Sequence, residues 1–404
     1  MSGRRFGGTL AAAALALLFW AVALAGAQRI AQRAQTVSVR LETGSLTLGD
    51  WRTLEKRREG ETKEEPRRIA LWTQHTGQQL SGMRSASGSV TEVEGEISLA
   101  PGGTLLAGSW PEPGDTQGCA VSEEAADALW GNAAPLNGAL EWGEKRYFVR
   151  AVYDGTGIMV PAREESTEFC ALEIESFSGE NGEEAARQFL LERGISQVEA
   201  ILDRPFLAQC LSWIASLPSW VLAFAVAARW LSAALREKRM PLRRAGLTAL
   251  ALLAVGGMLW IGQCRLFFPQ RWIPGRWSDF DFWSRLSEEI REIAGQALGL
   301  QPAGEDLALR KDCMTTVLAA AAAAVIWAFA AWRIRPMQLK EILFVEAGSV
   351  LCAFFAAAWL GIGAARGFWA AWPAAAGLLA LPDALKKGEK SLGRSEAGTS
   401  LQML

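Results

Sequence analysis

Long apolar runs separated by charged stretches constrain this chain more than any other feature. A helix needs about 20 mainly apolar residues to cross the hydrocarbon core of a bilayer. The first run, at residues 7–27, contains no charged residue. Six runs of this kind cover residues 7–27, 206–228, 245–263, 314–332, 342–365 and 367–382. We therefore expect an all-α membrane region of about six helices.

Three of the runs carry a qualification. The first follows Arg4 and Arg5, so a cleaved secretory signal peptide competes with an uncleaved anchor. Its length exceeds the usual apolar core of a signal peptide, about 7–15 residues, which favours the anchor. The second run contains Pro218, which should kink or break the helix. The last run is short and contains Pro373, so a re-entrant segment competes with a span.

Charge divides the chain in the same places. Residues 28–205 hold 29 acidic and 18 basic residues, whereas the remainder holds 14 acidic and 23 basic ones. Lys and Arg gather at the N-terminus, at residues 236–244 and 333–340, and in the tail. Basic loops stay on the cytoplasmic side, and these four segments share one side if all six runs span. The acidic segment and the loop at 265–313 then face outward.

These boundaries give an expected domain organisation. A cytoplasmic start and the first helix (1–27) are followed by an outer domain (28–205). Helices two and three come next (206–264), with a basic loop at 235–245 between them. An outer loop with an amphipathic helix (265–313), helices four to six (314–382) and a cytoplasmic tail (383–404) complete the expected order. The apolar stripe of the loop helix suits either the membrane interface or packing on the outer domain. Within the outer domain, residues 28–68 are charged and poorly patterned, and 55–68 should be solvated.

The clearest local pattern lies at residues 118–161. A short apolar strand ends at Val121, and Ser122 is placed to cap a helix whose first turn holds Glu123 and Glu124. Gly131 should end that helix. A turn, a strand at 139–142 and a return strand at 146–152 then form a hairpin. Strands are also expected at 69–72 and 89–99.

This string resembles the extracytoplasmic core domain of the MacB-like and FtsX-like permeases of ABC transporters. The resemblance rests on Val121, Ser122, Glu123, Ala126, Leu129, Trp130, Gly131, Pro135, Gly138, Tyr147, Val149 and Val152. Ala151 stands where the family usually has glycine, and Asn137 adds a residue to the usual turn. Residues 338–347 also resemble the start of a permease helix, but the chain departs from the family after Gly348.

The resemblance implies an α+β extracytoplasmic domain inserted between transmembrane helices. It also implies a separate ATPase subunit that docks on cytoplasmic loops, and a homodimer or heterodimer of permeases in the lipid membrane. The loop 235–245 or the segment 333–341 would take the ATPase-coupling role. The candidate coupling residues are Arg236, Lys238, Arg239, Arg243, Arg244, Arg333, Arg335 and Lys340.

Four cysteines are candidates for disulfide bonds in an outward environment, which permits such bonds. Cys264 and Cys313 flank the 265–313 loop, and Cys119 and Cys170 belong to the outer domain. Free thiols are the alternative for both pairs.

Chemistry-bearing motifs are few. The one histidine, His75, rules out a two-histidine metal site, and no phosphate-binding loop occurs. The acidic cluster Glu164, Glu165 and Glu168 is better explained by a solvated face than by a cation site. Glu346, in the fifth run, is better explained by a cytoplasmic ion pair than by a transport site. We expect no catalytic residues, cofactor or metal, and no nucleic-acid partner.

Two functional hypotheses remain. The first is a permease or mechanotransmission subunit of an ABC-type system in the bacterial cytoplasmic membrane, without its own ATPase. The alternative is a membrane-anchored extracytoplasmic binding or scaffold protein, although six spans exceed what an anchor needs. An integral-membrane enzyme is disfavoured because no nucleophile motif or paired intramembrane carboxylate is present.

Overall fold

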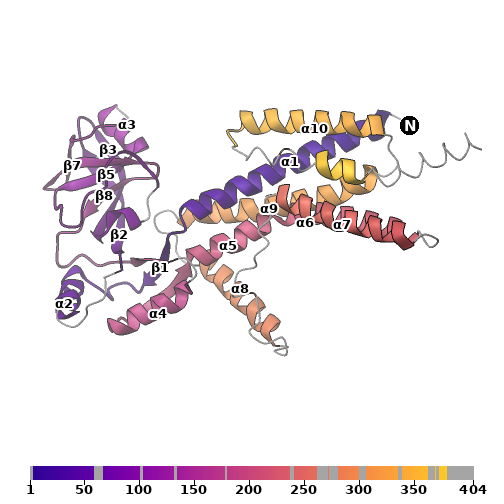
Figure 1. Ribbon diagram of the computed structural model, residues 1–404. Coiled ribbons are helices and arrows are strands. Elements are labelled where there is room, and N and C mark those ends of the chain that lie inside the picture. Colours follow the sequence, from indigo (N-terminus) through magenta and orange to yellow (C-terminus); the bar gives the residue numbers. More distant parts are fainter. Residues whose placement is uncertain are drawn as a thin grey trace, which may run out of the picture. The chain divides into compact units, whose positions relative to one another are not determined.

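The chain forms two compact units (Figure 1). The computed structural model describes residues 3–58, 67–100, 103–131, 134–177, 180–236, 241–261, 272, 281–299, 306–334, 339–362, 369 and 373–379. We call one unit the helical unit; it comprises Met1–Arg29, Gln209–Ile273 and Asp312–Leu404. We call the other the β-domain; it comprises Ile30–Ala208 and Pro274–Lys311.

One mixed sheet organises the β-domain. Its strands are β1 (Thr36–Leu41), β2 (Ile69–Ser81), β3 (Ser85–Gly95), β4 (Leu105–Gly108), β5 (Gly118–Ser122), β6 (Ala139–Trp142), β7 (Lys145–Tyr153), β8 (Ile158–Pro161), β9 (Ala171–Glu175) and β10 (Val198–Asp203). The order is β10-β1-β9-β2-β3-β8-β5-β7-β4, with β6 beside β2 and β7. The pairs β3–β8 and β5–β7 are parallel. The β-domain therefore has the α+β character expected from the sequence.

Four described α-helices accompany the sheet. They are α2 (Leu48–Arg58), α3 (Glu123–Trp130), α4 (Gly182–Glu192) and α8 (Phe282–Gly299), and a single 3₁₀ turn covers Ile97–Leu99. Helix α3 packs on β3, β5 and β7, and α4 packs on β1 and β10. Helix α8 is the amphipathic loop helix expected from the sequence. It contacts β10 and buries Leu286, while Trp283 stays exposed.

Local capping signals predicted α3 correctly. The Ser122 side chain accepts a hydrogen bond from the Ala125 backbone N–H at 3.2 Å, and Gly131 ends the helix in the left-handed region at φ 65°. The β6–β7 hairpin is also confirmed, with Gly143 at φ 60° in its turn. Local backbone chemistry is enough to set these elements.

The sequence pattern missed two elements within residues 28–68. This stretch contains a fully buried strand, β1, and a helix, α2. The expected strand at 89–99 also ends early, at Gly95, and a 3₁₀ turn follows at Ile97–Leu99. The polar residues of β1 meet partners distant in sequence, which a local pattern cannot reveal.

Six described α-helices make up the remaining elements. They are α1 (Gly3–Gln32), α5 (Arg204–Ala215), α6 (Leu217–Arg236), α7 (Pro241–Ile261), α9 (Asp306–Ile334) and α10 (Leu339–Trp359). Helices α5 and α9 begin in the β-domain and continue in the helical unit. The expected break near Pro218 is confirmed, because α5 ends at Ala215 and α6 starts at Leu217.

Three helical segments are long and apolar enough to cross a membrane. They cover Gly7–Gln32, Arg204–Arg236 and Asp306–Trp332 among the described residues. Two shorter apolar helices, Arg244–Gly257 and Leu343–Trp359, coincide with the third and fifth runs. Only residues 369 and 373–379 of the sixth run are described. The count of six spans therefore stays a prediction.

Small residues let α1 and α9 approach closely in the helical unit. Ala23, Ala27, Ala319 and Ala320 share one buried cluster. A Cβ added at Gly26 would overlap the Thr316 hydroxyl oxygen. Close approach through small residues is a common way for helices to associate in a bilayer, where hydrophobic burial gives little driving force.

Candidate functional site

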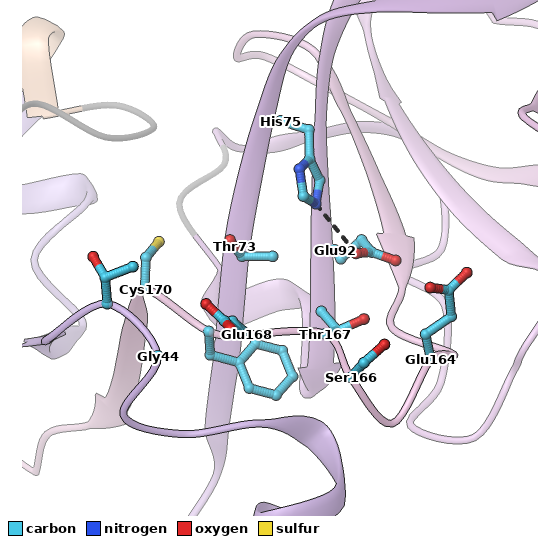
Figure 2. A pocket seen from close by; sticks show the side chains of 11 residues that line it. Gly44, Thr73, His75, Glu92, Glu164, Ser166, Thr167, Glu168 and Cys170 are labelled. Carbon is cyan, nitrogen blue, oxygen red and sulfur yellow. Dashed lines mark hydrogen bonds and ion pairs between the residues drawn. The ribbon is translucent and has the colours of Figure 1, made fainter.

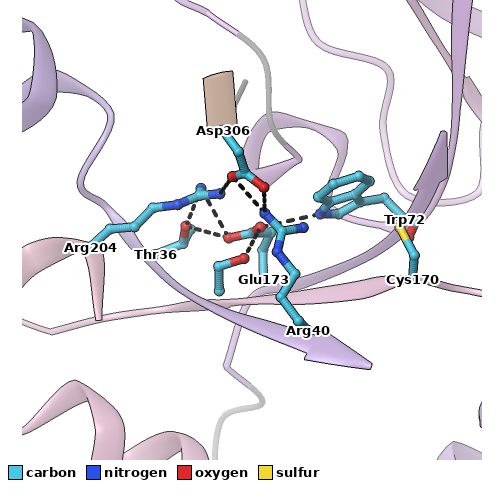
Figure 3. A network of polar contacts seen from close by, with 8 residues as sticks. Thr36, Arg40, Trp72, Cys170, Glu173, Arg204 and Asp306 are labelled. Carbon is cyan, nitrogen blue, oxygen red and sulfur yellow. Dashed lines mark hydrogen bonds and ion pairs between the residues drawn. The ribbon is translucent and has the colours of Figure 1, made fainter. Parts of the chain in front are cut away.

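A buried polar network within the β-domain includes the first residues of two candidate spans. We call it the junction network. It consists of Thr36, Ser38 and Arg40 on β1, Trp72 on β2, Glu173 on β9, Arg204 at the start of α5 and Asp306 at the start of α9 (Figure 3). Strand β1 also follows closely after α1. The network therefore joins residues next to all three long apolar segments.

Alternation along β1 explains why three polar residues reach one place. Successive side chains of a strand point to opposite faces. Val37, Val39 and Leu41 enter an apolar cluster with Phe189 and Leu190 of α4. Thr36, Ser38 and Arg40 lie on the other face and are buried as well.

Glu173 is the acceptor at the centre of the network. Its carboxylate is fully buried and accepts hydrogen bonds from the Thr36 and Ser38 hydroxyls, each at 2.7 Å. The Trp72 indole N–H and Arg204 Nη1 donate to the same carboxylate, each at 3.2 Å. Burial alone would raise the pKa of Glu173. The charges of Arg204 and Arg40 and the two hydroxyl donors outweigh burial and hold that pKa below its ordinary value.

Asp306 supplies the second carboxylate. Arg40 Nη2 donates to both of its oxygens, at 2.7 and 2.6 Å. Arg204 Nη2 lies 3.8 Å from Asp306 Oδ1. Figure 3 shows the Asp306 carboxylate facing both guanidinium groups. The Arg40 guanidinium also lies over the Trp72 ring, 4.9 Å from its centroid.

Two cations and two anions balance in this buried space. The exposed side-chain fractions are 5% for Arg40, 7% for Asp306, 11% for Arg204 and 0% for Glu173. Removing one partner from such a set leaves an uncompensated buried charge, which typically costs about 3–5 kcal/mol. The network therefore resists separation of β1, β9 and the first turns of α5 and α9.

An open pocket of about 370 Å³ lies elsewhere in the β-domain (Figure 2). His75 Nε2 and Glu92 Oε2, on neighbouring strands, are 3.2 Å apart along its wall. Glu164 and Glu168 also line it, and Lys145 Nζ lies 2.6 Å from Glu164 Oε1. The hydrogen bond from Lys145, with its charge, lowers the pKa of Glu164. His75 thus pairs with the carboxylate of Glu92.

Metal-binding clusters are not found in the described part of the chain, where no three His, Cys, Asp or Glu residues gather to hold an ion. Glu164 is paired with Lys145 and 63% exposed, as the solvated-face interpretation expects. Three glutamates, Glu92, Glu164 and Glu168, are among the described residues that line the pocket.

Few of the sequence-predicted coupling residues have described side chains. Arg236 ends α6, and Arg244 lies in the first turns of α7. Arg243, Arg333 and Lys340 belong to helices α7, α9 and α10. Lys238, Arg239 and Arg335 lie outside the described residues. The coupling assignment stays a prediction.

The two candidate disulfide bonds have different outcomes in the structure. Cys119 and Cys170 are both free thiols, so the bridge considered between them is not formed. Cys119 packs in one apolar cluster and Cys170 against another, which keeps the two thiols apart. Cys170 Sγ donates to the Trp72 carbonyl oxygen at 3.4 Å. Cys264 lies outside the described residues, and the Cys264–Cys313 bridge stays a prediction.

Sequence reasoning missed every charged residue of the junction network. Arg40 and Glu173 stand in short strands with no motif, and Asp306 was expected in a loop. The one available signal was the strict polar–apolar alternation of residues 36–41, which indicates a strand with one buried face and does not reveal that the polar face is buried as well.

Comparisons with known proteins add two likenesses. No family model and no curated protein matches the chain. The periplasmic region of MacB from Actinobacillus actinomycetemcomitans is similar, at 14% identity and a TM-score of 0.34, over 45% of this chain and 94% of that one. The extracellular domain of the noncanonic ABC-type transporter YknZ from Gram-positive bacteria is similar at 13% identity and 0.30, over 41% and 99%. Both scores are below 0.5, so neither likeness assigns a role to any residue here.

Proposed function

We propose that this chain is a permease or mechanotransmission subunit of an ABC-type system in the bacterial cytoplasmic membrane. Its β-domain faces outward, and a separate ATPase acts on its cytoplasmic side. The residue pattern at 118–161 supports the family assignment. The three long apolar segments support the membrane location.

The observation that carries the proposal is the junction network. Each long apolar segment begins or ends next to one of its residues: Thr36 follows α1, Arg204 starts α5 and Asp306 starts α9. A helix end that moves must either carry β1 and β9 with it or separate buried charges. Separation is costly, so movement of the helices is transmitted to the sheet. An inert anchor has no need of such a link.

On the cytoplasmic side, the basic loop 235–245 or the segment 333–341 contacts the ATPase. Arg236 and Arg244 are exposed, as a docking surface requires. A second permease copy or a related permease completes the assembly.

Affinity capture tests the partner. The tagged full chain, solubilised in mild detergent, is expected to retain a nucleotide-binding ATPase from its native membrane. Replacing Arg236, Lys238, Arg239, Arg243 and Arg244 with glutamine should remove the ATPase. A control with Arg67→Gln and Arg187→Gln, both in ion pairs of the β-domain, should keep it. Wild-type capture without any ATPase would contradict the proposal.

The alternative, a membrane-anchored binding or scaffold protein, draws on the pocket that His75 and Glu92 line. The two functions differ in one measurable respect. A coupled subunit changes hydrogen exchange in its β-domain when its ATPase binds ATP, whereas a passive anchor does not.

A further inference from the structure

The junction network consists of two halves that are held differently. Glu173 accepts hydrogen bonds from Thr36, Ser38, Trp72 and Arg204. All four donors lie on β1, β2 or the first residue of α5. This half needs nothing from α9 and forms a fixed part of the β-domain.

The other half depends on one side chain of α9. Arg40 Nη2 donates hydrogen bonds to both carboxylate oxygens of Asp306. Arg40 Nε and Nη1 and Arg204 Nε have no hydrogen-bond partner among the described residues. Asp306 can therefore leave without breaking any hydrogen bond to Glu173. Its departure changes the charge of the site by one unit.

The charges of Arg40 and Arg204 make the position that Asp306 occupies specific for a carboxylate. Without Asp306, Glu173 is the one carboxylate among the described residues of the network, so the two guanidinium groups leave the buried site with a net positive charge. A carboxylate is the group that neutralises it and accepts the free donors. Asp306 is also in the first turn of α9, where a negative charge is favoured by the helix dipole.

A second aspartate on α9 provides a contrast. Asp312 pairs with Arg29 of α1 at 2.7 Å, and the Arg29 side chain is 47% exposed. The boundary between the β-domain and the helical unit falls between Lys311 and Asp312. One continuous helix thus contains Asp306, which belongs to the β-domain, and Asp312, which belongs to the helical unit.

We propose that Asp306 is a detachable latch. In one state its carboxylate is docked against Arg40 and Arg204, and in a second state the first turn of α9 withdraws while the Glu173 half stays intact. The use of this latch in an ATPase cycle rests on the proposed function; the latch itself is a property of this chain.

Hydrogen exchange measured by mass spectrometry tests the latch on the full chain in lipid nanodiscs. Asp306→Asn keeps the shape of the side chain and removes its charge. We expect exchange at residues 306–311 to rise at least tenfold in this variant, with β2 and β3 unchanged. The matched control Asp312→Asn should leave residues 306–311 as in the wild type. Asp306→Glu should behave more like the wild type than Asp306→Asn does.

Two results would overturn the latch. Unchanged exchange at 306–311 in Asp306→Asn would mean that Asp306 does not hold the helix. An equal rise across β1, β2, β3 and β9 would mean that Asp306 stabilises the whole domain and is not separable.

A second experiment tests the latch and the proposed function independently of each other. With the ATPase captured, ATP should change exchange at residues 306–311 of the wild type by at least threefold, and much less in Asp306→Asn. No nucleotide effect in a proven complex overturns the latch as a switch. Failure to capture any ATPase counts against the proposed function and leaves the first experiment standing.

Discussion

Arg40 and Asp306 are 266 residues apart in the sequence, yet Arg40 Nη2 lies 2.7 and 2.6 Å from the two Asp306 oxygens in a buried site. Arg40 comes from a strand that follows one candidate span, and Asp306 starts another. A pair of this kind links the elements that carry its two residues, and it adds little to the overall free energy of unfolding. Buried ion pairs cost desolvation as well as gaining attraction. Their main consequence here is that β1, β9 and the first turns of α5 and α9 move together for as long as Asp306 stays docked.

A double-mutant cycle tests this view of the pair. Arg40→Met leaves Asp306 buried without its main hydrogen-bond donor and should destabilise the full chain by roughly 3–5 kcal/mol. Arg40→Met with Asp306→Leu removes both charges, and we expect it to melt at a higher temperature than Arg40→Met alone. Thermal unfolding in detergent, followed by tryptophan fluorescence, provides the measurement. Strictly additive effects would show that the two residues do not interact.

Acid sensitivity should follow from Glu173. Its folded-state pKa is held below the ordinary value of 4.5. A depressed carboxyl pKa adds stability above the unfolded-state pKa, and that stability is lost as pH falls through the folded-state pKa. Thr36→Val with Ser38→Ala removes two donors that lower the pKa. The melting temperature of the wild type should therefore exceed that of this variant, and the difference should be largest at neutral pH.

The same difference should shrink below about pH 4.5, where Glu173 begins to protonate in the unfolded chain. Thr53→Val serves as a control, since Thr53 donates to the Gly49 carbonyl on the surface of α2. Its effect on melting temperature should not depend on pH in this range. A wild-type advantage that stays constant from pH 7 to pH 3 would rule out the role given to Glu173.

The parts of the β-domain that local chemistry specifies could be predicted from the sequence. Ser122 and Gly131 delimit α3 because a hydroxyl caps one end and glycine accepts a positive φ at the other. Pro218 correctly marked the break between α5 and α6. Each of these signals lies within a few residues of its effect.

The junction network could not be predicted in this way. Thr36, Ser38 and Arg40 are polar residues that taken alone indicate a solvated stretch, and their partners lie at positions 173, 204 and 306. Hydropathy also placed the start of the fourth span at Met314, whereas α9 begins at Asp306. Long-range ion pairs stabilise a polar first turn that a hydropathy window assigns to a loop.

Thiol reactivity should distinguish the cysteines. Burial raises the pKa of the Cys119 thiol to about 12, so almost none of it is thiolate at pH 8. We expect Cys119 to resist iodoacetamide in the folded chain and to react after denaturation. Peptide mapping by mass spectrometry identifies the modified residues, and rapid modification of native Cys119 would contradict its burial.

The same labelling tests the Cys264–Cys313 bridge. The chain has six cysteines. If the bridge forms, denatured unreduced protein should take up two fewer labels than denatured reduced protein, and the missing labels should map to Cys264 and Cys313. Equal labelling with and without reductant would show that both thiols are free.

Close packing of α1 on α9 should make Gly26 intolerant of any side chain. Alanine is a better helix former than glycine by about 1 kcal/mol, so Gly7→Ala, on the same helix with nothing within 4 Å of an added Cβ, should keep or raise the melting temperature. Gly26→Ala instead brings its Cβ against Thr316 Oγ1, and overpacking typically costs about 1–3 kcal/mol. Thr316→Ala removes that oxygen, which has no hydrogen-bond partner among the described residues. The double variant should therefore recover the stability that Gly26→Ala loses, as measured by thermal unfolding in detergent. A double variant no more stable than Gly26→Ala would place the strain elsewhere.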